Sequence, residues 1–450
     1  MALSGLDIFK KLPKTNCKKC NLPTCLAFAM QVAAGKMEIS LCPDVSDDVV
    51  AQIAEATAPP IRPVTIGTGD DALKIGEETV MFRHDKRFEH QPCIGLLLTD
   101  EMNDETLSKH IEQFKATGFE RVGIMMRAEV MAIKSMTGDT EKFKAIVKRV
   151  MEETQCLLVL MSDSPVVLEA GLSLCKDRKP LLCGVNAENL PQIAQLAKEN
   201  NCPVVAKGKD LDELADLTNK LTSAGVKDIV LYPIGTTLKD RFEQETMIRR
   251  LALKKIFRPL GFPTINFPCD FTSSKDEEML IAATFVAKYS GIIILSTLEP
   301  HYTYPLFCLR MNIYTDPQRP MTMEEKVYEF NNPDKDSPIL VTTNFSLTYF
   351  LVTGEIESSR KPVWLAIQNT EGLSVLTAWS AGKFTAESIA KFIKSSGIAE
   401  KVSHKNLIIP GYVAELSGDL EEEMGAGWKV IVGPREAPSL PGFLKQYQVN

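Results

Sequence analysis

The sequence predicts a mixed α/β protein with a small cysteine-rich N-terminal domain, a central (β/α)8 TIM barrel and a C-terminal Rossmann-like domain. Three observations predict this fold class. Four of the 11 cysteines lie within residues 17–42, eight apolar runs alternate with amphipathic segments after residue 93, and the pattern changes again after residue 325. At 450 residues the chain is long enough for two to three domains.

The composition excludes several classes of protein. A net charge of −7 gives no support to nucleic-acid binding, and 44% apolar residues are enough for a core in each domain. The chain starts with no apolar run of signal-peptide length, and its most apolar runs, at 93–100 and 291–297, are too short to span a bilayer. We therefore expect a cytoplasmic protein whose cysteines are reduced.

The clustered cysteines, Cys17, Cys20, Cys25 and Cys42, have the spacing C-x2-C-x4-C-x16-C, and Pro43 follows the last of them. Thiolates two residues apart can turn back onto one metal, and a Cys-Pro ending is familiar from iron–sulfur ligation. The spacing favours a [4Fe-4S] cluster. A zinc site with four thiolate ligands is the main alternative, although such sites more often contain two C-x2-C pairs. The remaining alternative is that the four thiols bind no common metal.

The first domain is expected to span residues 1–60. Apolar residues at helical spacing follow Cys25, and a second short helix begins near Ser46 and ends before the proline pair at 59–60. A domain of about 60 residues has a small core and would depend on its metal for stability. Residues 61–92 are expected to be a linker, which could contain a β-hairpin.

The barrel is predicted over residues 93–325. Its strands are continuous apolar runs, which indicates burial on both faces and therefore a parallel sheet. Eight such runs over about 220 residues is the strand count of a TIM barrel, and a doubly wound open sheet is the alternative. The expected strands are residues 93–100, 121–126, 156–163, 179–185, 202–208, 227–233, 262–268 and 291–297.

Polar side chains follow four of the predicted barrel strands, where barrel enzymes hold their catalytic groups: Asp100, Asp163, Asn186 and Lys207. Asp100 can simply cap the helix that follows it. No HExxH or GxSxG motif occurs, and the five histidines form no cluster in the sequence. A scaffold is therefore favoured over an active site, because a fold does not imply a function.

The last domain is expected to span residues 326–450, with four strands and helices between them. Hydroxyl groups, glycines and free backbone amides follow its strands, and at the carboxyl ends of parallel strands such groups make a ligand crevice. Ordinary turn preferences explain each of these loops taken alone, but they do not explain why four such loops occur in one small domain. The crevice predicts a large, nearly neutral ligand with polar edges. The four strand ends are 342–344, 372–375, 410–411 and 433–437.

Two phosphate-binding motifs are absent from the chain. The segment AGKFT at 381–385 lacks the first glycine of a phosphate loop, since residue 377 is threonine. No GxGxxG sequence follows a predicted strand, which disfavours a dinucleotide.

Motifs along the whole chain resemble those of one family. The opening LPKTNCKKCNLPTC, the middle DKRF and NIYTDPQ, and the closing VTTNFSLTYF, TEGLSVLTAW, IIPG and VIVGPREA resemble the large (gamma) subunit of the corrinoid iron–sulfur protein, a family shared with the gamma subunit of the acetyl-CoA decarbonylase/synthase complex. The resemblance implies a [4Fe-4S] cluster on Cys17, Cys20, Cys25 and Cys42. It also implies a cobamide-binding C-terminal domain, with contacts from Thr342, Thr343, Thr348, Gly372, Leu373, Ser374, Val375 and Ala437.

The resemblance further implies a methyl carrier of the reductive acetyl-CoA pathway rather than an independent enzyme. Cobamide Co(I) would accept a methyl group from methyltetrahydrofolate, or a related pterin, through a methyltransferase and deliver it to acetyl-CoA synthase. The cluster would return Co(II) to Co(I) with an electron from a low-potential donor. The implied partners are the small subunit, in a heterodimer, the methyltransferase, and acetyl-CoA synthase/CO dehydrogenase, in the cytoplasm of an anaerobic cell.

A motif of many cobalamin proteins is missing. None of the five histidines lies in D-x-H-x-x-G, which supplies a lower axial ligand to cobalt. Together with the resemblance, this predicts a base-off cobamide without a histidine ligand, an arrangement that makes Co(II) easier to reduce. The alternatives are an iron–sulfur electron-transfer adapter without corrinoid and a barrel methyltransferase with a structural zinc.

Overall fold

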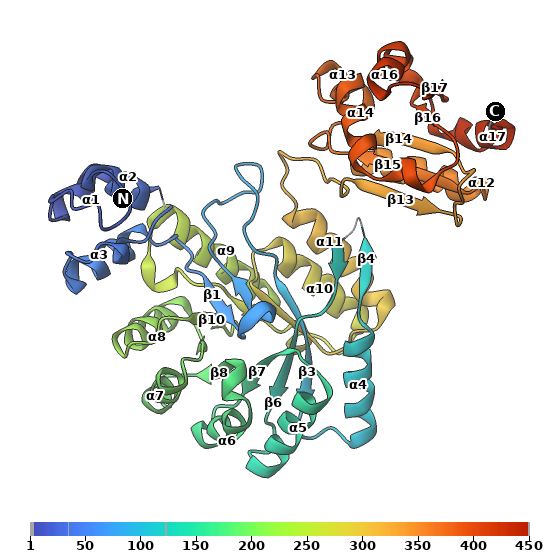
Figure 1. The fold of residues 1–450 in the computed structure, drawn as a ribbon. Coiled ribbons are helices and arrows are strands. Elements are labelled where there is room, and N and C mark those ends of the chain that lie inside the picture. Colours follow the sequence, from blue (N-terminus) through green and yellow to red (C-terminus); the bar gives the residue numbers. More distant parts are fainter. Residues whose placement is uncertain (1–3, 35, 122–123, 449–450) are drawn as a thin grey trace. The chain divides into compact units, whose positions relative to one another are not determined.

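The computed structural model describes residues 4–34, 36–121 and 124–448 of the chain. These residues form two compact units, which are described separately (Figure 1). The first unit contains the chain up to Gly118 and residues Arg127–Tyr314; the second contains Phe119–Met126 and the chain from Thr315 onward. Within the described ranges no helix combines the length and the apolar content needed to cross a bilayer.

The N-terminal part of the first unit is helical and holds the clustered cysteines. Its elements are α1 (Gly5–Lys11), α2 (Cys25–Ala33), the 3-10 turn η1 (Ile39–Leu41) and α3 (Asp47–Thr57). Ser4 and Asp7 form a capping box at the start of α1, and the Thr24 side chain caps α2. The elements share a small core, to which Cys25 and Cys42 themselves belong.

Eight parallel strands form the centre of the first unit. In the order of the sheet they run β10-β9-β8-β7-β6-β3-β12-β11, and a parallel bridge between Leu231 and Thr264 joins β10 to the start of β11. The sheet therefore closes into a barrel, as predicted, and the open-sheet alternative is wrong. The strands are β3 (Cys93–Thr99), β6 (Val130–Lys134), β7 (Leu157–Met161), β8 (Leu181–Val185), β9 (Val204–Gly208), β10 (Ile229–Pro233), β11 (Ile265–Asn266) and β12 (Ile292–Leu295).

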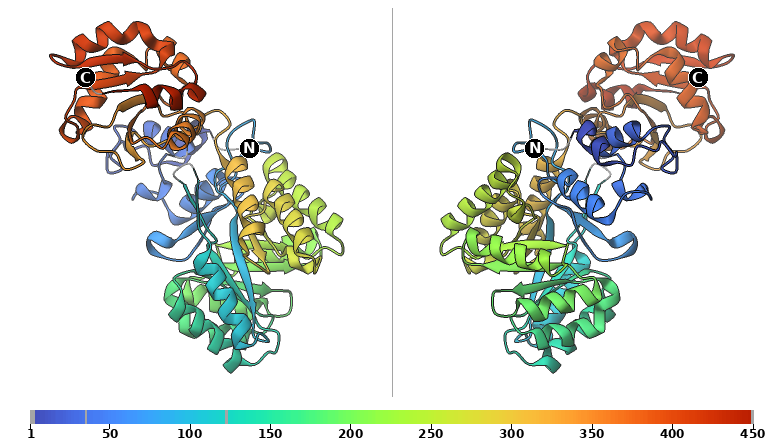
Figure 2. Two further views of the ribbon diagram at one scale, coloured as in Figure 1. Left: turned by 90° about the vertical axis from the view of Figure 1, so that its right-hand side faces the viewer. Right: turned by 90° about the vertical axis from the view of Figure 1, so that its left-hand side faces the viewer.

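Helices surround the barrel on the outside (Figures 1 and 2). They alternate with the strands along the chain, which is the connection that parallel neighbours require. The helices are α4 (Asp104–Ala116), α5 (Thr140–Glu153), α6 (Pro165–Cys175), α7 (Leu190–Asn200), α8 (Leu211–Ser223), α9 (Leu238–Lys255), α10 (Lys275–Ala287) and α11 (Pro300–Tyr314).

The predicted barrel strand at 121–126 is wrong. The chain forms an antiparallel hairpin there, β4 (Phe119–Arg121) and β5 (Ile124–Met126), which belongs to the second unit; the predicted residues Val122 and Gly123 lie outside the described residues. The barrel strand is β6 instead, which is buried from Val130 to Ile133. In contrast, Met125 of β5 is 60% exposed. The apolar runs at 121–126 and in β6 therefore differ in burial rather than in composition.

The segment expected to be a linker, residues 61–92, contains a hairpin of β1 (Val64–Ile66) and β2 (Leu73–Ile75). Val64, Ile66 and Ile75 are fully buried in the core of the barrel. The backbone N–H of Gly67 donates to the carbonyl of Lys179, just before β8, so the hairpin covers the amino ends of the strands. The expected β-hairpin is thus present, and it packs on the barrel.

The second unit is a five-stranded sheet with helices on both faces (Figure 1). The strand order of this sheet is β13-β15-β14-β16-β17. Its four other strands are parallel and were predicted, whereas β13 (Lys326–Phe330) is antiparallel and was not predicted. One buried core lies under α13, α14 and α16, and another under α12 and α17. The remaining elements are β14 (Ile339–Thr343), α12 (Ser346–Ser359), β15 (Val363–Gln368), α13 (Val375–Ser380), α14 (Ala386–Ser395), α15 (Ile398–Lys401), β16 (Asn406–Ile409), η6 (Gly411–Leu416), α16 (Ser417–Met424), β17 (Lys429–Val432), η7 (Ala437–Ser439) and α17 (Leu440–Gln446).

The pairing of β3 with β6 predicts a large effect of Gly95→Ala. Gly95 lies opposite Val130, and an added Cβ would meet the Val130 side chain and would lie 2.7 Å from the Val130 carbonyl oxygen. Because a backbone atom is involved, we expect Gly95→Ala to lower the free energy of unfolding by about 1–3 kcal/mol, measured by urea denaturation.

Gly354→Ala is the matched control, since nothing lies within 4 Å of a Cβ at that position in α12. We expect this variant to be neutral or stabilised by up to about 1 kcal/mol. Equal stability of Gly95→Ala and the wild type would contradict the pairing of β3 with β6.

Candidate functional site

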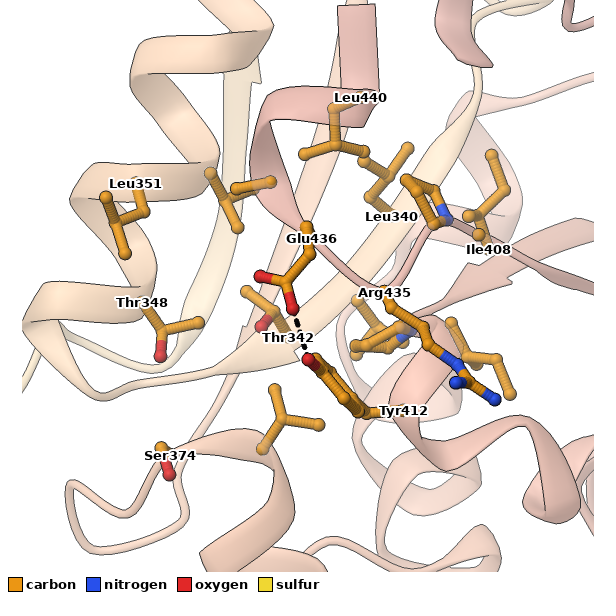
Figure 3. Close-up of a pocket in the computed structure, with 18 of the residues that line it drawn as sticks. Leu340, Thr342, Thr348, Leu351, Ser374, Ile408, Tyr412, Arg435, Glu436 and Leu440 are labelled. Atoms are coloured by element: carbon orange, nitrogen blue, oxygen red, sulfur yellow. Dashed lines mark hydrogen bonds between the residues drawn. The ribbon is translucent and has the colours of Figure 1, made fainter. Parts of the chain in front are cut away.

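A crevice opens at the carboxyl ends of β14, β16 and β17 in the second unit (Figure 3). The chain passes from β14 to β15 on one side of the sheet and then to β16 on the other side, so the loops that follow β14 and β16 diverge. Parallel sheets bind ligands at such a reversal of strand order. The crevice has a volume of about 250 Å³. Residues that line it include Leu340, Thr342, Thr348, Leu351, Ser374, Val375, Leu376, Ile408, Pro410, Tyr412, Gly433, Arg435, Glu436 and Ala437.

The crevice is mainly apolar, with a few polar groups at defined places. Thr342, Thr348 and Ser374 contribute hydroxyl groups, and the Tyr412 hydroxyl donates a hydrogen bond to the Glu436 carboxylate (Figure 3). The Thr342 hydroxyl oxygen is buried and has no hydrogen-bond partner in the described residues. Since buried hydroxyls are normally paired, this orphan group indicates a ligand that would complete its hydrogen bonding.

The buried side chain of Asn344 holds the loop that carries Ser374. Its Oδ1 accepts hydrogen bonds from the backbone N–H groups of Thr370, at 2.9 Å, and Gly372, at 3.0 Å. Its Nδ2 donates to Asn369 Oδ1 at 3.1 Å, and its own backbone N–H donates to the Gln368 carbonyl. Asn344, which directly follows β14, therefore fixes the loop at 369–374 that follows β15.

Two glycines allow close approaches around the crevice. Gly372 has φ = +77°, and a Cβ there would lie 2.8 Å from Thr322 Cγ2. A Cβ on Gly411 would lie 2.5 Å from the Gly433 carbonyl oxygen and 2.9 Å from the Arg435 nitrogen. The loops after β16 and β17 can therefore touch only because residue 411 has no side chain.

Five of the eight residues predicted to contact a cofactor in this domain line the crevice: Thr342, Thr348, Ser374, Val375 and Ala437. The other three do not. Thr343 is fully buried beside the crevice, Gly372 shapes the loop, and Leu373 packs on the core under α13.

Tyr412, Arg435 and Glu436 also line the crevice. Arg435 and Glu436 fall within the predicted strand end 433–437, but none of the three was among the predicted cofactor contacts. Their position directly after the predicted strand ends at 410–411 and within 433–437 was the available signal. The apolar walls, Leu351 and Leu376, gave no signal, because both read as ordinary helix residues.

The four clustered thiols lie in the helical part of the first unit. Cys25 and Cys42 are buried, Cys20 is half-buried and Cys17 is exposed. Burial raises the pKa of the Cys42 thiol, and the neighbouring Cys20 and Cys17 raise it further. Cys17, Cys20 and Cys42 are thus close enough to interact electrostatically, although within the described ranges no three His, Cys, Asp or Glu side chains are already drawn together as metal ligands.

The loop before α2 has a backbone suited to wrapping a thiolate-bound group. Lys14, Asn16, Lys18 and Asn21 all have left-handed φ angles, between 50° and 62°, which non-glycine residues seldom adopt. The backbone N–H of Asn16 donates to Cys25 Sγ at 3.3 Å, and Asn16 Oδ1 accepts from the Cys25 N–H at 2.8 Å. N–H groups directed at sulfur are a feature of iron–sulfur sites, so the donor set fits a cluster.

The polar residues at the ends of the barrel strands have structural partners. Asp100 accepts hydrogen bonds from the backbone N–H of Met136, at 2.6 Å, and from the hydroxyl groups of Ser135 and Thr137. It does not cap α4, whose cap is Asn103.

Asp163 and Lys207 form an ion pair at 3.1 Å, and Asn186 Oδ1 accepts from two backbone N–H groups of its own turn. These contacts account for all four residues without a substrate.

No histidine is among the residues that line the crevice. His404, the one histidine of the second unit, is buried, and both of its ring nitrogens are hydrogen-bonded, to the Ser337 carbonyl and the Asn406 N–H. The crevice therefore offers no imidazole to a ligand.

Comparisons with known proteins extend over the whole chain. A family model described as "CO dehydrogenase/acetyl-CoA synthase delta subunit" matches residues 63–444, and one described as "Putative Fe-S cluster" matches residues 12–43. The chain is 44% identical to the "Corrinoid/iron-sulfur protein large subunit" of Moorella thermoacetica, with 99% of both chains covered. It is 34% identical to the "Acetyl-CoA decarbonylase/synthase complex subunit gamma" of Methanopyrus kandleri, over 99% of this chain and 98% of that one.

Among solved structures, dihydropteroate synthase from Thermus thermophilus matches with a TM-score of 0.40 and 15% identity, over 56% of this chain and all of that one.

The orphan hydroxyl of Thr342 predicts that Thr342→Val stabilises the ligand-free chain. Valine has nearly the same shape and removes a buried polar atom that has no partner. We expect the free energy of unfolding of the second unit to rise by about 1 kcal/mol, measured by calorimetry of the ligand-free chain.

Thr370→Val is the contrasting variant, because the Thr370 hydroxyl group is within hydrogen-bond distance of Asn344 Oδ1 and the Leu373 carbonyl. This second variant should be destabilised. Destabilisation of both variants by equal amounts would show that Thr342 is satisfied in the ligand-free protein.

Proposed function

The chain belongs to the family of corrinoid/iron–sulfur protein large subunits and acetyl-CoA decarbonylase/synthase gamma subunits, and on that premise we propose that it carries methyl groups on a cobamide held in the crevice. The observation that carries the proposal is the crevice itself, a mainly apolar site at a reversal of strand order, with no histidine in its lining and a buried Thr342 hydroxyl group that has no partner among the described residues. A cobamide is large, nearly neutral and edged with amides, which suits such walls and hydroxyl groups.

The residues of the crevice would bind and orient the cofactor. Leu351 and Leu376 offer apolar surface to the macrocycle, and Thr342, Thr348 and Ser374 offer hydroxyl groups to its polar edge. When bound, the cobamide would supply a Co(I) nucleophile that takes a methyl group from methyltetrahydrofolate or a related pterin, through a methyltransferase, for delivery to acetyl-CoA synthase. Because the crevice offers no imidazole, the chain would give the metal no histidine ligand. We propose that the cofactor's own lower base is also held away from the metal, which would favour the reduced state.

We propose that Cys17, Cys20, Cys25 and Cys42 hold a [4Fe-4S] cluster. The N–H···S bond from Asn16 and the burial of Cys25 and Cys42 support this assignment. When bound, the cluster would supply the single electron that returns Co(II) to Co(I). We propose that residues 1–60 form the cluster domain and that residues 61–92 connect it to the barrel scaffold at 93–325. Residues 326–450 would form the cobamide domain.

Exposed apolar side chains on two helices beside the crevice support a partner subunit. Leu347, Phe350 and Leu351 on α12 are 57%, 44% and 55% exposed, and Leu376 and Trp379 on α13 are 45% and 37% exposed. Apolar patches of this kind mark interfaces. We infer that the small subunit of the same protein covers this face, and that the methyltransferase and acetyl-CoA synthase reach the cofactor in turn, in the cytoplasm of an anaerobic cell.

Metal analysis of protein purified without air tests the proposal against its alternatives. Cobalt together with iron supports the carrier. Iron without cobalt supports an electron-transfer adapter, and zinc without either supports a structural zinc site.

Cys20→Ala should remove the cluster and leave cobamide binding intact, because the thiols and the crevice belong to different units. We expect iron to fall to near zero while the cobalt content stays at the wild-type level, both measured by elemental analysis. Cys156→Ala, which changes a buried thiol outside the cluster segment, is the control and should retain both metals. Loss of cobalt together with iron in Cys20→Ala would contradict two independent sites.

Ser374→Phe should block the cobamide and spare the iron. Ser374 lines the crevice at the start of α13, and among the described residues its hydroxyl group is hydrogen-bonded only to Thr377 Oγ1, at 3.0 Å, so the change mainly adds bulk to the crevice. We expect at least a tenfold loss of cobalt retained after gel filtration (~1.4 kcal/mol of affinity). Ser380→Phe, at the exposed far end of the same helix, is the control. Normal cobalt content in Ser374→Phe would mean that the corrin binds elsewhere.

A further inference from the structure

Two neighbouring residues supply all the charge among the described residues that line the crevice. Arg435 and Glu436 lie in the loop that follows β17, and every other lining residue is apolar or uncharged. A charge beside apolar walls selects strongly among ligands, because a bound ligand must balance the charge or leave it in water. The charge at this edge of the crevice therefore adds a requirement to that of shape.

Glu436 is already engaged, whereas Arg435 is not. The Tyr412 hydroxyl donates to the Glu436 carboxylate (Figure 3). In the part of the chain that the structure describes, no ion pair joins Arg435 to Glu436 or to another carboxylate. The Glu436 carboxylate raises the pKa of the Tyr412 hydroxyl and the Arg435 charge opposes this shift, so the guanidinium lies close enough to act on the crevice. The crevice thus presents one unpaired cation at its edge.

The backbone that precedes Arg435 is held in place. The Gly433 N–H donates to the Ile409 carbonyl at 2.9 Å, and the Pro434 carbonyl accepts from the Gly411 N–H at 3.1 Å. Both hydrogen bonds join the loop after β17 to the chain that leaves β16. Proline also restricts its own φ to about −65°, so the main chain before Arg435 has little freedom. A side chain on a fixed base loses less entropy when it binds a ligand.

We propose that Arg435 binds the phosphodiester in the nucleotide loop of a cobamide and thereby selects complete cobamides over cobinamides, which lack that loop. The inference rests on the proposed function, because it requires a cobamide in the crevice. The peripheral amides of a cobamide are neutral, whereas the phosphodiester carries a negative charge. A guanidinium matches this group, since its N–H groups can form two parallel hydrogen bonds to two phosphate oxygens.

The test measures the affinity of the full-length chain, freed of cofactor, for a cobamide, for cobinamide phosphate and for cobinamide, by absorbance titration. The last two probes differ only in the phosphate, so the ratio of their Kd values isolates the contribution of that group. We expect the wild type to bind cobinamide phosphate about tenfold more tightly than cobinamide at low salt. Arg435→Gln should bring this ratio to about one, weaken cobamide binding about tenfold and leave the Kd of cobinamide unchanged.

Two further variants separate phosphate recognition from other effects. Arg435→Lys keeps the charge but loses the paired hydrogen bonds, so its ratio should lie between those of the wild type and Arg435→Gln. Lys391→Gln removes one positive charge from an exposed position on α14 and should behave as the wild type. Because Arg435 is exposed too, the wild-type ratio should shrink between about 20 and 300 mM salt as its charge is screened.

A wild-type ratio that persists in Arg435→Gln would overturn the assignment, as would a wild type that binds cobinamide phosphate and cobinamide equally. An equal loss of affinity for both probes in Arg435→Gln would also overturn it, because Arg435 would then only shape the crevice. Failure of the wild type to bind any of the three corrinoids is a different result, which would overturn the proposed cobamide site itself.

Discussion

The reversal of strand order at β14 is the constraint on which the ligand site depends. Because β15 lies on one side of β14 and β16 on the other, the loops that leave this sheet diverge and open a crevice between them. The buried Asn344 then holds the loop after β15, and the absence of a side chain at Gly411 lets the loops after β16 and β17 meet. Thr342 lines this crevice, and its buried hydroxyl group has no hydrogen-bond partner among the described residues. The fold therefore creates both the site and a polar group that a ligand could bind.

The sequence predicted those features that depend on residues close together in the chain. The cysteine spacing, the buried parallel strands and the polar strand ends at 342–344 and 372–375 are local patterns of this kind. It did not predict which of two apolar runs, 121–126 or β6, enters the barrel, because both have the composition of a strand. Burial decides between them, and burial depends on the pairing of Gly95 with Val130, a tertiary contact. Tyr412 was missed for the same reason, since only the fold brings it to Glu436, 24 residues further along the chain.

The clustered thiols and the crevice lie in different units. The thiols lie in a small helical part, where left-handed backbone turns direct an N–H group at Cys25. The crevice lies in a unit whose one histidine, His404, has both ring nitrogens engaged in structural hydrogen bonds. Between them in sequence stands a barrel whose polar strand ends are satisfied by one another and by neighbouring loops, as expected of a scaffold. The proposed methyl carrier needs this division, because the group that supplies electrons and the group that reacts have different requirements for ligands and solvent.

The central claim is that the crevice holds a cobamide without a nitrogen ligand below the metal. Electron paramagnetic resonance of the full-length protein, loaded with cobamide and poised in the Co(II) state, tests it most directly. An axial nitrogen splits each cobalt line into a triplet. The account predicts cobalt hyperfine lines without that splitting, and triplet splitting of the lines would contradict it.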